Sequence, residues 1–199
     1  MKYIPIYCLL FLGICTTLTG QSSTEEKLDT FLDVLDENQK AMGSISLYQN
    51  GQPFYQKSIG FSDVETGTRA SEQTLYRVGS VSKIYTAVLI MQEVEQGRLS
   101  LSTTLDEFLP EVVDASKISI EHLLKHQSGL YNITDSTDYA FYYTAVQDRQ
   151  AQLARINAHQ LQFEPGAEMA YSNSNYILLT YILEDLNQQS FSKLLNNRI

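Results

Sequence analysis

The sequence contains only two cysteines, and both lie near its beginning. Cys8 and Cys15 are not followed by any other cysteine in the remaining residues. Residues 21–199 can therefore form no disulfide bond, no thiolate nucleophile and no cysteine-ligated zinc site. Their stability has to come from packing.

Long apolar runs and positive charge are also scarce. No run approaches the roughly 20 apolar residues of a membrane-spanning helix, which excludes a polytopic membrane protein. Lysine and arginine number 14 against 23 acidic residues, giving a formal net charge of −9. Such an acidic surface repels phosphate backbones, so no nucleic-acid partner is expected. With 43% hydrophobic and 19% charged residues, the sequence predicts a folded chain, and its length of 199 residues suggests one domain, alone or with a modest second lobe.

The first 20 residues have the features of a secretion signal. Lys2 gives a positive start, residues 4–14 form a short apolar stretch, and small or polar residues lead to Gln21. We expect a signal peptide over 1–20, cleavage before Gln21, and export to the periplasm or the medium. A retained membrane anchor is the alternative, but the stretch is too short to span a bilayer. Lipidation of Cys15 is disfavoured by the bulky Ile14 before it.

Periodicity and turn residues predict the elements of residues 21–199. A hairpin is indicated by Asn50-Gly51, a dipeptide that suits a two-residue turn between strands. Helices are indicated where apolar residues recur every three or four positions. The expected elements are a helix over 24–40, strands over 43–48 and 54–60, a strand over 75–79, a long buried helix over 80–96, a short helix over 120–126, an aromatic segment over 131–143, and a helix from 174.

Ser80 and Lys83 form a Ser-x-x-Lys pair at the start of the long predicted helix. Residues three apart share a helical face, so the lysine amine can contact the serine hydroxyl and shuttle its proton. Ser80 would also lie at the positive end of the helix dipole, where its N–H can help to bind an oxyanion. A second copy, Ser190 and Lys193, lies in a polar segment and is interpreted as accidental.

Tyr-x-Asn also occurs twice. Asn50 follows Tyr48 into the hairpin turn, where turn geometry alone explains the asparagine. Tyr171 and Asn173 instead lie on a loop that leads into the last helix. A tyrosine beside positive charge can ionise below its usual pKa of about 10 and act as a base. For a single tyrosine, a packing role is the simpler explanation. Only the combination with Ser80 and Lys83 favours a catalytic role for Tyr171.

The histidines do not predict a metal site. His122 and His126 are four residues apart, as in zinc-binding helices, but the string lacks the glutamate of a zinc protease and a third ligand. His159 is expected on the surface. No glycine-rich phosphate loop or dinucleotide motif is present, so no cofactor and no metal are expected.

Read in order, several strings resemble the serine β-lactamase-related family, which groups class C β-lactamases, D-alanyl-D-alanine carboxypeptidases and related esterases. The resemblance runs from about residue 43 to 199. The strings are LYRVGSVSK (75–83), EQGRLSL (95–101), FLP (108–110), LLKHQSGL (123–130), FEPG (163–166) and YSN (171–173).

The resemblance implies a role for each matching residue. Ser80 would be the acylated nucleophile and Lys83 its proton partner. Tyr171 would be the base for serine and later for water, and Asn173 would donate to the substrate's amide. His126 would brace the loop without a catalytic role. The implied fold is α+β and β-lactamase/transpeptidase-like, with an antiparallel sheet flanked by helices and a mainly helical lobe.

One family motif is not found. The family has Lys or His, then Thr or Ser, then Gly, on a strand that follows the Tyr-x-Asn segment. Here Glu65-Thr66-Gly67 lacks the cation and precedes Ser80. We therefore expect a domain over 21–199 that is truncated, with its C-terminal strands missing and its activity reduced. Losing one oxyanion donor costs roughly 2.7–4 kcal/mol of transition-state stabilisation.

The implied activity is acyl-enzyme hydrolysis of a small amide or ester: a β-lactam, a D-Ala-D-Ala peptide or a simple ester. The alternatives are a penicillin-binding or peptidoglycan-sensing module without turnover, and an inactive remnant. The expected partner is a small-molecule or peptide substrate. The oligomeric state is left open.

Overall fold

The computed structural model describes residues 23–199, and the predicted signal peptide with Cys8 and Cys15 lies outside them. The chain divides into two compact units between Arg77 and Val78, and each is described by itself. The prediction of a single domain over 21–199 stays a prediction.

The first unit joins one helix to two small antiparallel sheets. Ser23 caps its helix, because Ser23 Oγ accepts a hydrogen bond from the Glu26 N–H over 3.1 Å. Asn50 and Gly51 both have positive φ, 52° and 76°, as the predicted two-residue hairpin turn requires. The elements are α1 (Thr24–Glu37), β1 (Gly43–Gln49) paired with β2 (Gln52–Ile59), and β3 (Phe61–Asp63) paired with β4 (Thr68–Arg69). The predicted helix and hairpin are confirmed.

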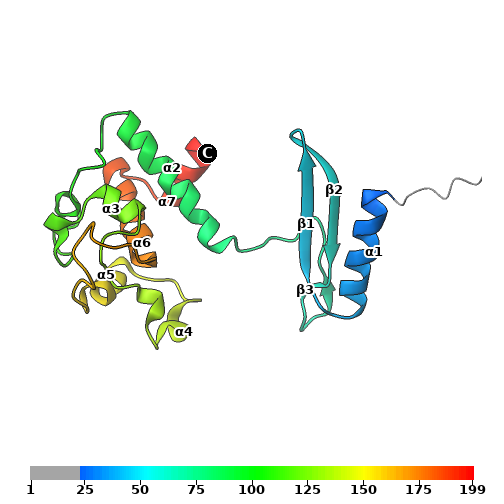
Figure 1. Ribbon diagram of the computed structural model, residues 1–199. Coiled ribbons are helices and arrows are strands. Elements are labelled where there is room, and N and C mark those ends of the chain that lie inside the picture. The colour runs from blue at the N-terminus through cyan, green and yellow to red at the C-terminus, as the bar shows by residue number, and fades with distance from the viewer. Residues whose placement is uncertain (1–22) are drawn as a thin grey trace, which may run out of the picture. The chain divides into compact units, whose positions relative to one another are not determined.

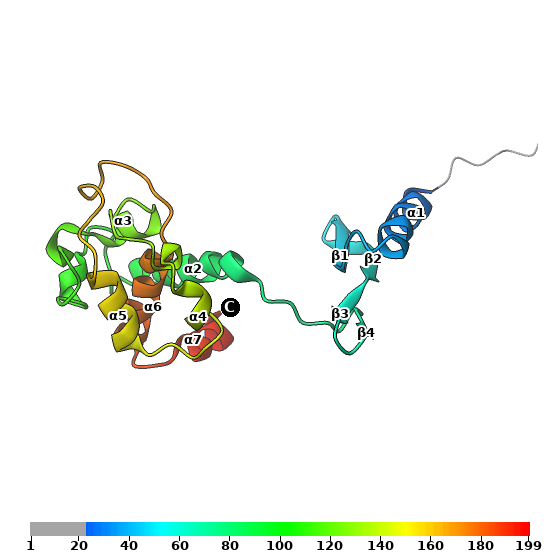
Figure 2. The same ribbon diagram turned by 90° about the horizontal axis from the view of Figure 1, so that it is seen from below.

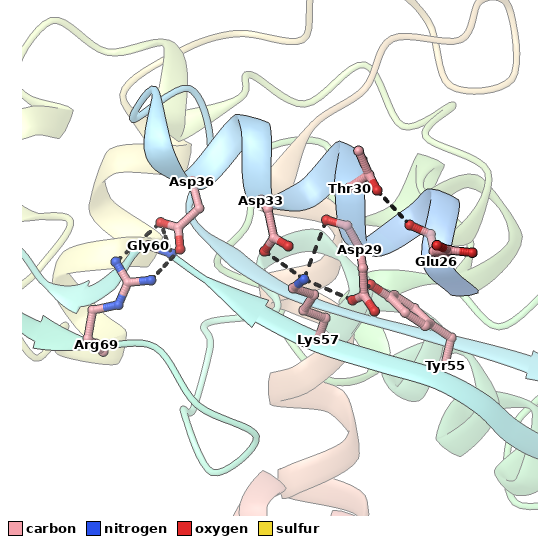
Figure 3. A network of polar contacts seen from close by, with 9 residues as sticks. All are labelled: Glu26, Asp29, Thr30, Asp33, Asp36, Tyr55, Lys57, Gly60 and Arg69. Carbon is pink, nitrogen blue, oxygen red and sulfur yellow. Dashed lines mark hydrogen bonds and ion pairs between the residues drawn. The ribbon is translucent and has the colours of Figure 1, made fainter. Parts of the chain in front are cut away.

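Charged side chains fasten α1 to the hairpin (Figure 3). Lys57 of β2 lies between two carboxylates of α1, with Nζ 2.8 Å from Asp29 Oδ1 and 2.7 Å from Asp33 Oδ1. Hydrogen bonds from Lys57 and Tyr55 lower the pKa of Asp29. Asp36 binds the Arg69 guanidinium. Asp29 and Asp33 are exposed and Asp36 is half-buried, so these ion pairs add orientation more than stability, and the apolar contacts between α1 and the hairpin carry the packing.

The second unit, residues 78–199, is helical. Its long helix α2 (Ser82–Glu95) packs against α6 (Asn173–Asn187) and α7 (Phe191–Arg198), and α3 (Ile120–Leu124) packs against α6 (Figures 1 and 2). Leucine and isoleucine side chains from these helices and from the segments that connect them form most of the core. The elements are η1 (Gly79–Val81), α2 (Ser82–Glu95), η2 (Leu105–Glu107), η3 (Ala115–Lys117), α3 (Ile120–Leu124), η4 (Ile133–Asp135), α4 (Tyr139–Tyr142), α5 (Arg149–Asn157), α6 (Asn173–Asn187) and α7 (Phe191–Arg198).

The predicted strand before α2 is wrong, and the predicted burial of α2 is incomplete within its own unit. Residues 75–79 form no strand, since neither sheet of the first unit extends to them. The long helix is also not buried all round within its own unit. Leu89 and Ile90 are buried, whereas Ile84, Val88 and Met91 are exposed. Apolar periodicity reports that a face avoids water, but it does not report which segment covers that face.

A buried carboxylate ties α2 to the end of the chain. Glu93 of α2 is fully buried, and its Oε1 accepts hydrogen bonds from Arg198 of α7 and from Asn187 of α6. Its Oε2 faces Arg98 over 2.5 Å. A buried charge is tolerated where it is paired in this way. Glu93 thereby fixes how three helices meet.

No helix between residues 23 and 199 has both the length and the hydropathy to cross a membrane.

Candidate active site

Ser80 lies in the 3-10 turn that opens α2. Gly79 has φ = 52°, a left-handed value that glycine adopts without strain, and the chain turns there into η1 and then α2. Because Ser80 already has helical backbone, the side chain three residues later lies on the same side. Lys83 Nζ donates a hydrogen bond to Ser80 Oγ over 3.2 Å.

Tyr171 reaches the same serine from far along the chain. Its Oη lies 2.8 Å from Ser80 Oγ, although 91 positions separate the two residues. The Lys83 ammonium lies over the Tyr171 ring, 5.0 Å from its centroid. The structure therefore brings the hydroxyl, the ammonium and the phenol together.

Two adjacent loops hold Tyr171 in this position. The His126 carbonyl accepts a hydrogen bond from the Ala170 N–H over 2.9 Å. Close by, Gly129 has φ = 77°, and a Cβ there would lie 2.1 Å from the Phe163 carbonyl oxygen. Only glycine allows so close an approach. Residues 123–130, the string LLKHQSGL, therefore support the loop that precedes Tyr171.

The His126 ring supports the same loop. Its Nδ1 accepts a hydrogen bond from the Ser172 N–H over 3.2 Å, and its ring centroid is 4.5 Å from that of Tyr171. Burial, and then the nearby Lys83 ammonium, lower the pKa of His126. Burial and a neighbouring ammonium both disfavour the charged form of an imidazole. These contacts favour the predicted bracing role.

Asn173, the first residue of α6, completes the group. Its Oδ1 accepts a hydrogen bond from Lys83 Nζ over 2.7 Å. The ammonium therefore donates to Ser80 on one side and to Asn173 on the other. All four predicted site residues, Ser80, Lys83, Tyr171 and Asn173, meet in one place.

The electrostatics of the site favour ionisation of Tyr171. Burial raises the pKa of its phenol, but hydrogen bonding with Lys83 and Ser80 and the charge of Lys83 outweigh that effect. The pKa of Tyr171 is consequently lowered from 10. A phenol beside an ammonium can lose its proton more readily and accept one from serine.

A cavity of about 530 Å³ adjoins the site. Lys83 and Asn173 line one part of it, and Tyr142 and Tyr143 line another. Part of the aromatic segment 131–143 thus borders a space next to the reactive groups.

The histidines are spread over separate structural roles. His122 belongs to the capping box of α3, where its Nδ1 accepts from the Ser119 N–H over 3.3 Å. His159 is exposed and stacks on Tyr131 with centroids 3.7 Å apart. Within residues 23–199, no three His, Cys, Asp or Glu side chains gather in a group that could hold a metal ion.

The duplicate motifs lie elsewhere. Ser190 is the N-cap residue of α7, and its hydroxyl lies 3.2 Å from that of Ser192. Tyr48 is largely exposed at the end of β1, and Asn50 forms the hairpin turn.

Sequence reasoning missed Asn132 and Thr134. Asn173 Nδ2 donates to Thr134 Oγ1 over 2.9 Å and to Asn132 Oδ1 over 3.2 Å. An asparagine before a short 3-10 turn is typical of an N-cap residue. Asn132 is indeed the N-cap of η4. No sequence signal connects it to a residue 41 positions later.

Comparison with known proteins identifies the family of the chain. The Beta-lactamase family model matches residues 28–199. The chain belongs to the beta-lactamase family. Protein flp of Staphylococcus aureus (strain COL) is 30% identical, over 88% of this chain and 36% of its own length. Teichoic acid D-alanine hydrolase of S. aureus (strain MRSA252) is 27% identical, over 84% of this chain and 40% of its own. This member of the family spans well under half the length of these curated relatives.

Solved structures confirm the predicted β-lactamase/transpeptidase-like fold. A penicillin binding protein from Bacillus halodurans gives a TM-score of 0.72 at 25% identity, covering 83% of this chain and 51% of that one. A D-stereospecific amidohydrolase from Streptomyces sp. gives 0.58 at 31% identity, covering 62% and 41%. The octameric penicillin-binding protein homologue from Pyrococcus abyssi gives 0.71 at 26% identity, covering 87% and 41%.

Proposed function

We propose that this beta-lactamase family member is a serine hydrolase that works through an acyl-enzyme on a small amide or ester. The observation that carries the proposal is the position of Ser80 Oγ, 2.8 Å from the Tyr171 phenol and 3.2 Å from the Lys83 ammonium. A serine hydroxyl is a weak nucleophile until a neighbouring base takes its proton. Here two groups that can exchange protons touch it.

In the proposed acylation, Tyr171 as phenolate removes the Ser80 proton while Ser80 Oγ attacks the substrate's carbonyl carbon. The tetrahedral oxyanion accepts a hydrogen bond from the Ser80 N–H, because N–H groups in the first turn have no acceptor within the helix. When the intermediate collapses, the bond to the leaving group breaks. The proton passes to the leaving amine or alkoxide, through Lys83 or directly from Tyr171.

Deacylation repeats these steps with water. Tyr171 takes a proton from water while the water oxygen attacks the acyl carbon. The bond between Ser80 Oγ and that carbon then breaks. The proton returns to Ser80, so both residues recover their starting states. The lowered pKa of Tyr171 supports this role, because a base has to be unprotonated at the working pH.

The proposed substrates are small amides and esters: a β-lactam, a D-Ala-D-Ala peptide or a simple ester. The names of the relatives support this class, since one is a teichoic acid D-alanine hydrolase and another a D-stereospecific amidohydrolase. We further propose export through a signal peptide over 1–20, which fits substrates at the cell envelope.

Covalent labelling tests the proposal. Wild type, Ser80→Ala and the matched control Ser190→Ala are incubated with a fluorescent penicillin and with a fluorophosphonate, and adducts are located by mass spectrometry. We expect labelling of wild type and Ser190→Ala at Ser80, and none in Ser80→Ala. A penicillin adduct that forms but is not hydrolysed would support the penicillin-binding alternative. Absence of any Ser80-dependent adduct would overturn both covalent functions.

A further inference from the structure

Asn132 and Thr134 contact the side-chain nitrogen of Asn173, whose side-chain oxygen contacts Lys83. We infer that these two residues are positioning residues, which fix the Asn173 amide with its oxygen toward Lys83. This inference rests on the proposed function, because it concerns how the Lys83 ammonium is held against the nucleophile.

Hydrogen-bond complementarity allows the Asn173 amide only one orientation. Its Oδ1 accepts from the Lys83 ammonium over 2.7 Å, and its Nδ2 donates to two oxygens, Thr134 Oγ1 and Asn132 Oδ1. Turning the amide over would place an NH₂ group against an ammonium and an oxygen against an acceptor oxygen. The first pair forms no hydrogen bond because an ammonium has no acceptor, and the second forms none with Asn132 Oδ1, which only accepts, or with Thr134 while its hydrogen points to Asn132. The surroundings thus choose the orientation.

The Thr134 hydroxyl makes this network directional. It accepts from Asn173 Nδ2 and donates to Asn132 Oδ1, over 2.9 and 3.0 Å. A hydroxyl has one hydrogen to donate, and this one is used toward Asn132. The hydroxyl oxygen consequently remains an acceptor for Asn173.

Asn132 anchors the network to the backbone. Its side chain is nearly buried, its Nδ2 donates to Asp135 Oδ1 over 2.8 Å, and its Oδ1 accepts from the Asn173 backbone N–H over 3.0 Å. One side chain therefore fixes both the first backbone N–H of α6 and the amide of the same residue. Buried networks of this kind hold side chains in a single arrangement when every group is satisfied.

The network has a consequence for Asn173 itself. Both hydrogens of its amide point to protein acceptors, while its oxygen holds Lys83. The predicted contact between Asn173 and the substrate's amide requires one of those two bonds to be given up. In the resting site Asn173 acts on Ser80 through Lys83.

Removing the Thr134 hydroxyl tests the inference. Thr134→Val keeps the shape of the side chain but loses the acceptor, whereas Thr134→Ser keeps it. Thr103→Val is the matched control, because Thr103 accepts from the Ser100 N–H over 3.1 Å, away from the site. For Thr134→Val we expect the rate of Ser80 acylation by a fluorophosphonate to fall about tenfold, the equivalent of one hydrogen bond. The fluorophosphonate concentration at which the rate saturates should not change. Thr134→Ser and Thr103→Val should stay within about threefold of wild type.

A second readout needs no activity. In the wild type the side-chain NH₂ of Asn173, assigned through its loss in Asn173→Asp, should exchange slowly with solvent in NMR spectra. Thr134→Val should speed that exchange and Thr134→Ser should not. If Thr134→Val does not fold, Thr134→Ala is measured instead.

The two readouts separate two kinds of failure. If neither acylation rate nor amide exchange changes in the folded variant, the positioning role is overturned while Ser80 labelling still supports the hydrolase. If wild type is not labelled but the Asn173 amide is protected as expected, the proposed function fails and the orientation of the amide stands.

Discussion

The two Ser-x-x-Lys segments of this chain have the same spacing but different surroundings. Ser80 sits inside the first helical turn before α2, so Lys83 lies beside it, and a phenol from a distant loop meets the pair. Ser190 is an extended N-cap residue in front of α7, and its hydroxyl meets Ser192. The comparison shows that the motif gains chemical meaning only from helical backbone at the serine and a third group supplied by tertiary structure.

Replacing the lysine of each segment should give the largest difference in the rate of Ser80 acylation. Lys83→Met removes the ammonium that contacts Ser80 and Asn173, and we expect Ser80 acylation to fall about 10³-fold, within the range typical of lost acid–base partners. Lys193→Met should leave the rate within about twofold. Stopped-flow measurement of fluorophosphonate labelling checks both, and equal effects of the two changes would contradict the comparison.

Replacing the tyrosines should have the next largest effect. Tyr171→Phe removes the phenol oxygen 2.8 Å from Ser80 Oγ and should slow acylation by roughly 10²-fold. Tyr48→Phe, in the other Tyr-x-Asn, changes an exposed residue of β1 and should have no effect on the rate. The same labelling assay measures both variants. A Tyr171→Phe variant as fast as wild type would assign the base role to another group.

The pH dependence of acylation should show whether Tyr171 is the base whose ionisation controls the rate. Since the pKa of Tyr171 is lowered from 10 and its ionised form is the proposed base, the rate should rise with pH with a midpoint below pH 10. Each unit of pH below the midpoint should cost about tenfold in rate. In Tyr171→Phe this rise should disappear. A profile that still rises in this variant would show that a different group titrates.

The smallest effect is expected at Ser190. Its side chain makes no capping hydrogen bond to α7, so Ser190→Ala should lower the free energy of unfolding by less than about 0.5 kcal/mol. Urea denaturation followed by circular dichroism measures the change. A loss above 1 kcal/mol would show that this serine carries more structure than its contacts indicate.

Local signals in the sequence were sufficient where the structure is local. Asn50-Gly51 predicted its hairpin, and the apolar repeat predicted α1, because both depend on residues a few positions apart. The expected strand over 75–79 failed, because a strand exists only when another segment pairs with it.

The site divides in the same way. The contact between Ser80 and Lys83 follows from helical spacing. The approach of Tyr171 depends instead on the loops around His126 and Gly129. It could be anticipated only through the family resemblance. Asn132 escaped notice because its partner Asn173 is 41 positions away. Patterns in a sequence describe neighbours along the chain, and most of this site is made of neighbours in space.

The residues that orient Asn173 also bear on how the protein should be produced. Asn132-Ile133-Thr134 is the tripeptide that eukaryotic secretory pathways glycosylate. The Asn132 amide is nearly buried and donates to Asp135, so a sugar attached to its nitrogen has no room in the folded chain. Expression in yeast or mammalian secretory cells would yield a misfolded, modified fraction, which bacterial expression avoids.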